Sequence, residues 1–206
     1  MKIVVKAPTS KITRILQGWS EIALKKATTR SVNRAAVSIR KEATKLLKEK
    51  YNLPTSGGSK GGEGFKPPGI KPNIVIQNAK YSRKRELGEI HSIIRVSSKP
   101  ISLIHFVKGD KTPMDQRGIP VSKRTLLKVQ ITRGNTRKMK KVFIARANNS
   151  VQVYRKQMTM RKQSIPSLWR LIERPEIKER LLNFGRMRFE AEMEFNLPFY
   201  TAQLSK

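Results

Sequence analysis

Residues 20–51 read SEIALKKATTRSVNRAAVSIRKEATKLLKEKY, and this stretch decides the fold. Its apolar residues recur at steps of three and four positions, which places them on one face of an α-helix. That stripe comprises Val32, Ala35, Ile39, Ala43 and Leu46, with Leu24 and Thr28 continuing it backward. Pro54 follows as a stop, because proline cannot continue the hydrogen-bond ladder. The pattern predicts one long amphipathic helix over residues 20–51.

Small residues interrupt the apolar stripe of this helix. Ala27, Ala35 and Ala43 allow another element to approach the helix axis closely, as when a helix lies across a sheet. Lysine and arginine occupy most of the remaining surface, which is also typical of a solvated basic helix on an ordinary domain. The helix alone therefore indicates packing but no function.

The middle of the chain has the β-branched content and short lengths of antiparallel strands. Strands are predicted at residues 1–6, 89–97, 101–108, 126–133, 141–146 and 151–155, and residues 73–78 fit a strand or the start of a helix. Turn signals lie between consecutive strands, at Pro100, Gly134 and Asn148. We expect residues 89–97 to pair with 101–108, in an antiparallel sheet of about four or five strands.

Two further helices are predicted. A short one spans residues 10–19, and a final one runs from Pro175 to residue 196, where Leu197 and Pro198 end it. One face of the final helix is expected to carry Ile177, Leu181, Phe184, Arg188, Ala191 and Phe195. The predicted fold is α+β, with the long N-terminal helix and the C-terminal helix packed on a small antiparallel sheet with extended basic loops.

We expect residues 1–206 to form a single domain, which is an ordinary size for one core. Residues 55–72 hold six glycines and three prolines and are predicted to be a flexible arm. Its glycines lack the flanking strand and helix of a phosphate-binding loop.

Charge is the strongest feature of the composition. The chain has 45 Lys and Arg against 14 Asp and Glu, a net charge of +31. Such a charge repels itself unless a polyanion or an acidic protein surface is near, and nucleic acid is the default partner. No cysteine is present, which excludes disulfides and thiolate chemistry. No apolar run is long enough for a signal-peptide core or a membrane span, so we expect no membrane partner.

Catalytic groups are sparse. The two histidines, His91 and His105, fall in predicted strands among apolar residues, where a hydrogen-bonded histidine is more common than a metal ligand. Glu190, Glu192 and Glu194 spread around their helix instead of converging as an acid and base pair, and they suit a basic neighbour such as another copy of the chain. We therefore expect no enzyme activity, no cofactor and no metal.

Basic residues gather in three clusters. The residues expected to face an anion are Arg133, Arg137, Lys138, Lys140 and Lys141, which form a charged finger at a predicted hairpin tip, followed by Arg83, Lys84 and Arg85. A third cluster lies at residues 155–162. With few aromatic rings nearby, contacts to nucleic acid would reach phosphates without reading sequence. Solvated charge or contact with an acidic protein is an equally open interpretation.

The order of these features resembles the minor tail protein Z family of tailed bacteriophages. The segments that carry the resemblance are ATTRSVNRAAVSIRKEATKLLKEKYNL (residues 27–53), KPISLIHF (99–106), KKVFIARANNSVQVYRK (140–156) and IPSLWRLIERPEI (165–177). The basic insert MTMRKQ at residues 158–163 and the long arm at 55–72 depart from the family pattern.

The resemblance implies a tail-completion or neck protein at the head-proximal end of a phage tail. Its implied partners are the tail terminator, tube, connector and tape-measure protein, with DNA phosphates and further copies of the chain in an oligomeric ring. The implied location is the virion, assembled in the host cytoplasm, and no catalytic residue is implied. Two alternatives remain: an RNA-binding structural protein of a ribonucleoprotein particle, and a metal-dependent nuclease, for which few carboxylates gather.

Overall fold

The computed structural model describes residues 2–6, 20–56, 69–84, 86–109, 111, 126–147, 150–156 and 160–204. It confirms the α+β class, with two long helices, α2 (Glu21–Lys50) and α4 (Pro175–Leu204), and small antiparallel sheets. The chain forms two compact units. The first contains Met1–Ala43, Ile74–Val96 and Glu173–Lys206, and the second contains Thr44–Asn73 and Ser97–Ile172.

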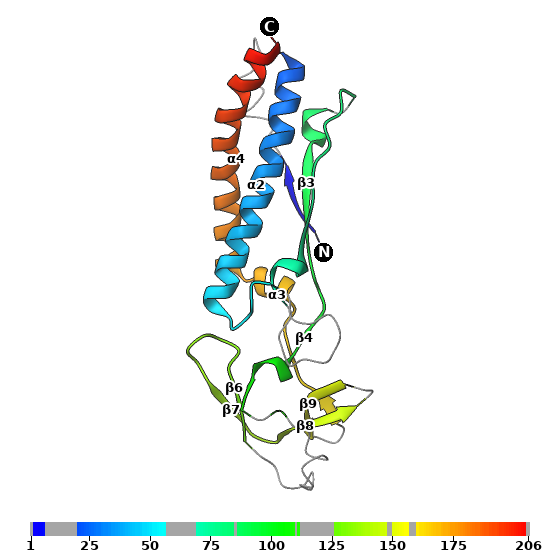
Figure 1. Ribbon diagram of the computed structural model, residues 1–206, viewed down its shortest axis with the longest axis vertical. Coiled ribbons are helices and arrows are strands. Elements are labelled where there is room, and N and C mark those ends of the chain that lie inside the picture. The colour runs from blue at the N-terminus through cyan, green and yellow to red at the C-terminus, as the bar shows by residue number, and fades with distance from the viewer. Residues whose placement is uncertain are drawn as a thin grey trace. The chain divides into compact units, whose positions relative to one another are not determined.

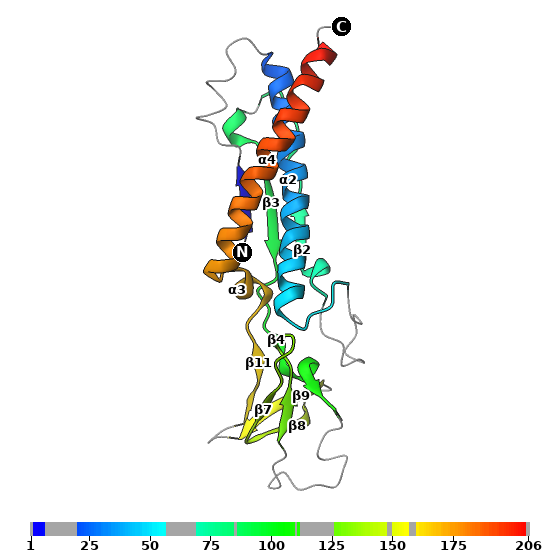
Figure 2. The same ribbon diagram turned by 90° about the vertical axis from the view of Figure 1, so that its left-hand side faces the viewer.

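The first unit joins two helices to a three-stranded sheet. In Figures 1 and 2, α4 runs beside α2 in the opposite direction, and α2 lies between α4 and the sheet. The sheet has the order β1 (Lys2–Lys6), β3 (His91–Val96), β2 (Ile74–Gln77), and both pairings are antiparallel. The edge strand predicted at residues 1–6 and the strand alternative for 73–78 are therefore confirmed.

The predicted stripe of α2 is buried. Val32 and Ala35 are fully covered, and Ile39, Ala43 and Leu46 are no more than 8% exposed. The small residues Ala27 and Ala35 of this stripe lie in one core cluster with Phe189 and Met193 of α4. An added Cβ at Gly185 of α4 would lie 2.9 Å from Cδ1 of Ile39. The long amphipathic helix is thus confirmed in its bounds and in its buried face.

The buried face of α4 differs from the predicted one. Ile177 and Leu181 are buried as expected, but Phe195 is 65% exposed and Ala191 is exposed. The covered positions continue instead in steps of four: Gly185, Phe189, Met193 and Leu197. A ridge with this spacing is inclined to the helix axis, so the two helices cross at an angle, as Figure 2 shows.

The predicted end of α4 at residue 196 was also wrong. The helix continues to Leu204 with Pro198 inside it. Proline removes one hydrogen bond and crowds the preceding turn, which usually ends a helix. Here Leu197 is buried in the α2–α4 core cluster and Tyr200 packs against that cluster, so tertiary packing holds the last turns in place.

Polar contacts fix the antiparallel register of α2 and α4. Asn196 donates a 3.0 Å hydrogen bond to the buried Ser31 hydroxyl. Arg180 pairs with Glu42 at 3.1 Å, and Arg34 pairs with Glu192 at the same distance. Each pair joins an early residue of one helix to a late residue of the other.

The described residues of the second unit form three small antiparallel sheets. The first has the order β5 (Val107–Lys108), β6 (Leu127–Val129), β7 (Arg137–Met139), and the second has the order β10 (Met160–Lys162), β9 (Ser150–Lys156), β8 (Val142–Ala147). The third pairs β4 (Ile101–Ser102) with β11 (Ser164–Ile165). It also contains the 3-10 helices η1 (Lys71–Asn73) and η3 (Leu103–Phe106), and helix α3 (Leu168–Ile172). A third 3-10 helix, η2 (Leu87–Glu89), belongs to the first unit. The strands of the described residues therefore divide among four sheets, where a single sheet was predicted.

The predicted pairing of residues 89–97 with 101–108 was wrong. β3 pairs with β1 and β2, whereas residues 101–108 form β4, η3 and β5. The reason is the pattern of burial, because Leu103 and Ile104 are adjacent and both are at most 3% exposed. A strand would point them to opposite faces, whereas the 3-10 turn of η3 brings both inside.

The proposed arm at residues 55–72 is paired at its two ends. The amide of Ile70 donates to the carbonyl of Pro54 at 2.9 Å, and the amide of Lys71 donates to the carbonyl of Thr55 at 3.0 Å. Ile70 is fully buried, so these ends belong to the core and not to a flexible arm. Residues 57–68 and the predicted short helix at 10–19 lie outside the described residues.

Candidate anion-binding surfaces

The basic residues predicted as a finger lie along a β-hairpin of the second unit. β6 pairs with β7 in the register Lys128 opposite Lys138 and Val129 opposite Arg137. Arg133 lies in the connecting turn, next to Gly134 with φ of 74°. Lys140 and Lys141 follow β7. We call the hairpin that carries Arg133, Arg137, Lys138, Lys140 and Lys141 the basic hairpin. The predicted finger was expected at a hairpin tip between residues 126–133 and 141–146, but β6 pairs with β7 within that stretch and β8 pairs with β9.

The far end of the basic hairpin is anchored. The amide of Asn52 donates to the carbonyl of Ile131 at 2.8 Å, and the amide of Arg133 donates to the carbonyl of Lys50 at 3.2 Å. Between them, Tyr51 and Thr132 form an antiparallel bridge. The hairpin tip therefore does not project freely. Its backbone is held against the end of α2.

The cations of the basic hairpin are solvent-exposed. Arg133, Arg137, Lys138, Lys140 and Lys141 are all exposed, and among the described residues no carboxylate pairs with them. Residues 116–172 contain 15 Lys and Arg and no Asp or Glu. The sequence therefore carried a signal more specific than the clusters themselves: a run of 57 residues without a single negative charge.

The second predicted cluster belongs to the first unit. Arg83 and Lys84 lie exposed in a turn after β2, and Arg85 lies outside the described residues. The backbone of this turn is tied to α2, because Nζ of Lys25 donates a 2.9 Å hydrogen bond to the carbonyl of Arg83. Lys25 is itself only 7% exposed and pairs with Glu21 at 2.5 Å.

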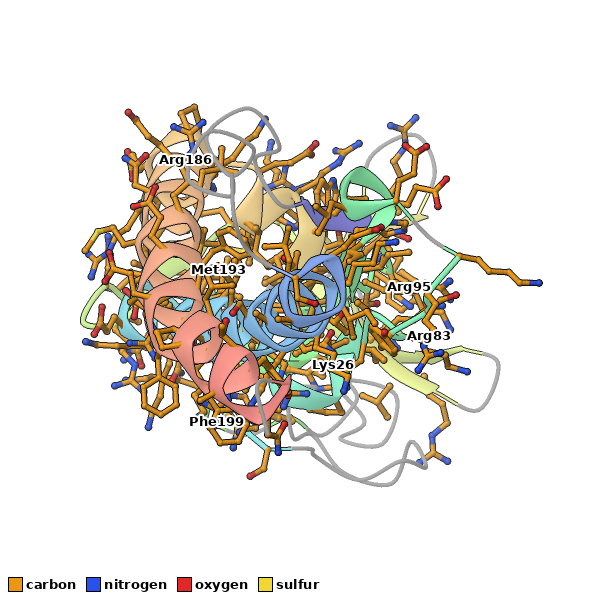
Figure 3. The ribbon with its side chains drawn as sticks, turned by 90° about the horizontal axis from the view of Figure 1, so that it is seen from above. Lys26, Arg83, Arg95, Arg186, Met193 and Phe199 are labelled. Carbon is orange, nitrogen blue, oxygen red and sulfur yellow. The ribbon has the colours of Figure 1, made fainter. Side chains whose placement is uncertain are left out.

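A hollow beside this turn was not predicted. Its volume is about 450 Å³, and it is lined by Lys26, Thr29, Arg30, Asn33, Arg34, Tyr81 and Tyr200. We call it the α2 groove. Viewed from above in Figure 3, Lys26 and Arg83 lie on the side of α2 that faces away from Arg186. The helical spacing of Lys26, Arg30 and Arg34 was visible in the sequence, but the two tyrosines come from distant segments.

The two histidines belong to different units. His91 lies in β3 of the first unit, where its Nδ1 is 2.8 Å from the carbonyl oxygen of Glu89, and His105 lies in η3 of the second. Partial burial lowers the pKa of Lys111.

Within the described residues, no three His, Asp or Glu side chains gather as a metal site. No described helix has the length and apolar content needed to cross a membrane.

Comparisons with known proteins identify no relative of this chain. No family model, no curated protein and no solved structure matches it. The function proposed below is therefore argued from the residues of the chain itself.

Proposed function

We propose that the protein is a structural subunit of a phage virion that completes the head-proximal end of the tail. It would contact the tail terminator or tube, meet DNA or the tape-measure protein through its basic loops, and assemble with further copies of itself. No catalysis is assigned to it.

The basic hairpin is the observation that carries this proposal. Five exposed cations lie on a hairpin whose turn is held against the end of α2, within a run of 57 residues that lacks carboxylates. Mutual repulsion of such charges is relieved when a polyanion or an acidic surface covers them. A non-enzymatic subunit that contacts DNA phosphates or acidic neighbours in a particle uses this property directly.

The outward face of α4 supports assembly with further copies. Met187 and Phe195 are 67% and 65% exposed, and with the exposed Ala191 they follow steps of four along the helix. Exposed apolar stripes of this kind mark protein interfaces. Glu190 and Glu194 are exposed beside the stripe. Because the chain is otherwise strongly basic, a second copy offers both an apolar stripe and complementary charge.

The test is sedimentation of a native lysate on a density gradient, with quantitative mass spectrometry of this chain in each fraction. The proposal expects co-migration with phage tails at a fixed small copy number. Co-migration with RNA-containing fractions that is lost on nuclease treatment would overturn it and favour the RNA-binding alternative. In the same gradient assay, Phe195→Glu should reduce incorporation of the chain into tails. Separately, a purified protein that stays monomeric at high concentration would contradict assembly with further copies.

A charge-reversal variant tests the basic hairpin. Replacing Arg137, Lys138, Lys140 and Lys141 with Glu should reduce incorporation into tails and leave the fold intact, because these side chains are exposed. The matched control reverses four exposed cations elsewhere: Lys41, Lys45, Lys178 and Arg186. Equal particle yield and infectivity for the hairpin variant and the wild type would refute the role of the hairpin.

A further inference from the structure

The α2 groove combines cations and aromatic rings on one surface of the first unit. Lys26, Arg30 and Arg34 recur every four residues on α2, so they line one side of the helix. Tyr81 follows β2 and is 36% exposed, and the half-buried Tyr200 comes from α4. Three separate segments of the chain therefore meet at this hollow of about 450 Å³.

The cations of the groove are not equally free. Arg34 pairs with Glu192 at 3.1 Å, a carboxylate that also pairs with Arg188 at 3.2 Å. Arg30 stacks over the Phe199 ring, 5.7 Å from its centroid, and donates a long 3.4 Å hydrogen bond to the Tyr200 hydroxyl. Both of those partners are uncharged. Within the described residues Lys26 makes no ion pair, so Lys26 and Arg30 leave the groove with about two uncompensated positive charges.

The walls of the groove are held in place before any ligand binds. Asn33 makes two hydrogen bonds to the backbone of Ala79, at 2.7 and 3.0 Å, and so fixes the segment that leads to Tyr81. Lys25 holds the following turn through the carbonyl of Arg83. Stacking on the Phe199 ring restrains the Arg30 guanidinium. Arg30 therefore loses less conformational freedom when a ligand binds.

We propose that the α2 groove binds one nucleotide of a single-stranded nucleic acid, with a backbone phosphate at Lys26 and Arg30 and the base against the exposed ring of Tyr81. Guanidinium and ammonium groups supply the donors that phosphate oxygens accept, and tyrosine rings stack on bases without regard to sequence. An acidic peptide would use the cations and leave the rings without a matching partner. The groove does not depend on the basic hairpin, which belongs to the other unit.

The experiment measures binding of a short fluorescein-labelled oligothymidine to the full chain by fluorescence anisotropy over a series of salt concentrations. The first variant is Lys26→Gln with Arg30→Gln. Its control is Lys178→Gln with Arg186→Gln, which removes the same charge from exposed positions of α4 outside the groove. Circular dichroism establishes that both variants are folded.

The groove variant should lower the slope of log affinity against log salt by about 0.7, because each phosphate of a single strand that is no longer neutralised removes about 0.7. The control should leave that slope unchanged. Tyr81→Ala should weaken binding about fivefold or more through lost stacking, whereas Tyr81→Phe should retain it. Equal slopes for the groove variant and its control would overturn the proposal.

Two further outcomes test the nucleotide assignment separately from the proposed function. If Tyr81→Ala binds the oligonucleotide as tightly as the wild type, the groove holds only an anion and the nucleotide assignment fails. If reversing the charges of the basic hairpin abolishes incorporation into tails while the groove variants still bind oligothymidine normally, the groove proposal fails and the proposed function stands. If the groove variants lose binding as predicted while the hairpin variant still enters tails normally, the groove proposal stands and the proposed function fails.

Discussion

Replacing Asn33 with alanine should weaken the attachment of the sheet to α2. The Asn33 amide oxygen accepts from the Ala79 amide at 2.7 Å and from the Ser92 hydroxyl at 2.5 Å, and its amide nitrogen donates to the Ala79 carbonyl at 3.0 Å. Ala79 and Ser92 are 8% and 0% exposed, so water replaces these partners poorly. The Ala79 amide keeps one acceptor, the Ser92 hydroxyl at 3.2 Å.

The expected cost of Asn33→Ala follows from the groups it leaves without a partner. An unsatisfied buried carbonyl costs about 1–3 kcal/mol, and the lost hydroxyl bond adds about 1 kcal/mol. The free energy of unfolding should therefore fall by about 3 kcal/mol. For a chain of this size that corresponds to a drop in Tm of about 6–12 °C.

The assay is urea and thermal unfolding followed by circular dichroism. Ser38→Ala is the matched control, because Ser38 is half-buried on the same helix and its side chain has no hydrogen bond in the described structure. It should change stability by less than about 0.5 kcal/mol. A free energy of unfolding for Asn33→Ala within about 0.5 kcal/mol of that of the control, the usual scatter of surface substitutions, would show that the Asn33 hydrogen bonds do not stabilise the attachment of the sheet to α2. A double-mutant cycle with Ser92→Ala would show whether the two side chains act together.

The remaining predictions concern α4. Gly185→Val should destabilise the first unit by about 1–3 kcal/mol through overpacking, since even a Cβ at this position would lie 2.9 Å from Cδ1 of Ile39. Ile39→Ala should relieve part of that cost, and strictly additive effects in thermal unfolding would contradict direct contact. Pro198→Ala should stabilise α4 by up to about 3 kcal/mol, because proline is the least favourable residue inside a helix. A lower Tm for this variant would show that the proline ring itself stabilises the fold.

The elements predicted correctly are those whose residues carry the information locally. Residues 20–51 contain about nine turns of consistent spacing, roughly 3.6 residues each, and a stop at Pro54, so the helix and its buried face could be read without knowing its neighbours. The strand pairing could not be predicted in this way. The segment ISLIHFVK has strand-forming residues throughout, but the burial of both Leu103 and Ile104 depends on which elements surround them.

The candidate sites divide in the same way. The basic hairpin is contiguous in sequence, so its residues were found, whereas its anchoring to Lys50 and Asn52 joins positions about 80 residues apart and leaves no local pattern. The α2 groove depends on Tyr200 lying beside Arg30, a pairing across 170 positions. Composition could predict that an anion would bind, but only the fold could place aromatic rings beside the cations.

The misassigned face of α4 shows why periodicity alone does not identify a core. This helix carries two apolar stripes, one with Gly185, Phe189 and Met193, and the other with Met187, Ala191 and Phe195. Both have helical spacing, and the second holds Phe195, a ring that periodicity alone would place in a core. Packing against α2 selects the first stripe, because Gly185 leaves room there for Ile39. The C-terminal part of the face predicted to be core therefore points outward. A regular apolar stripe in that position is typical of an interface, and the second copy of the chain proposed for assembly would cover it.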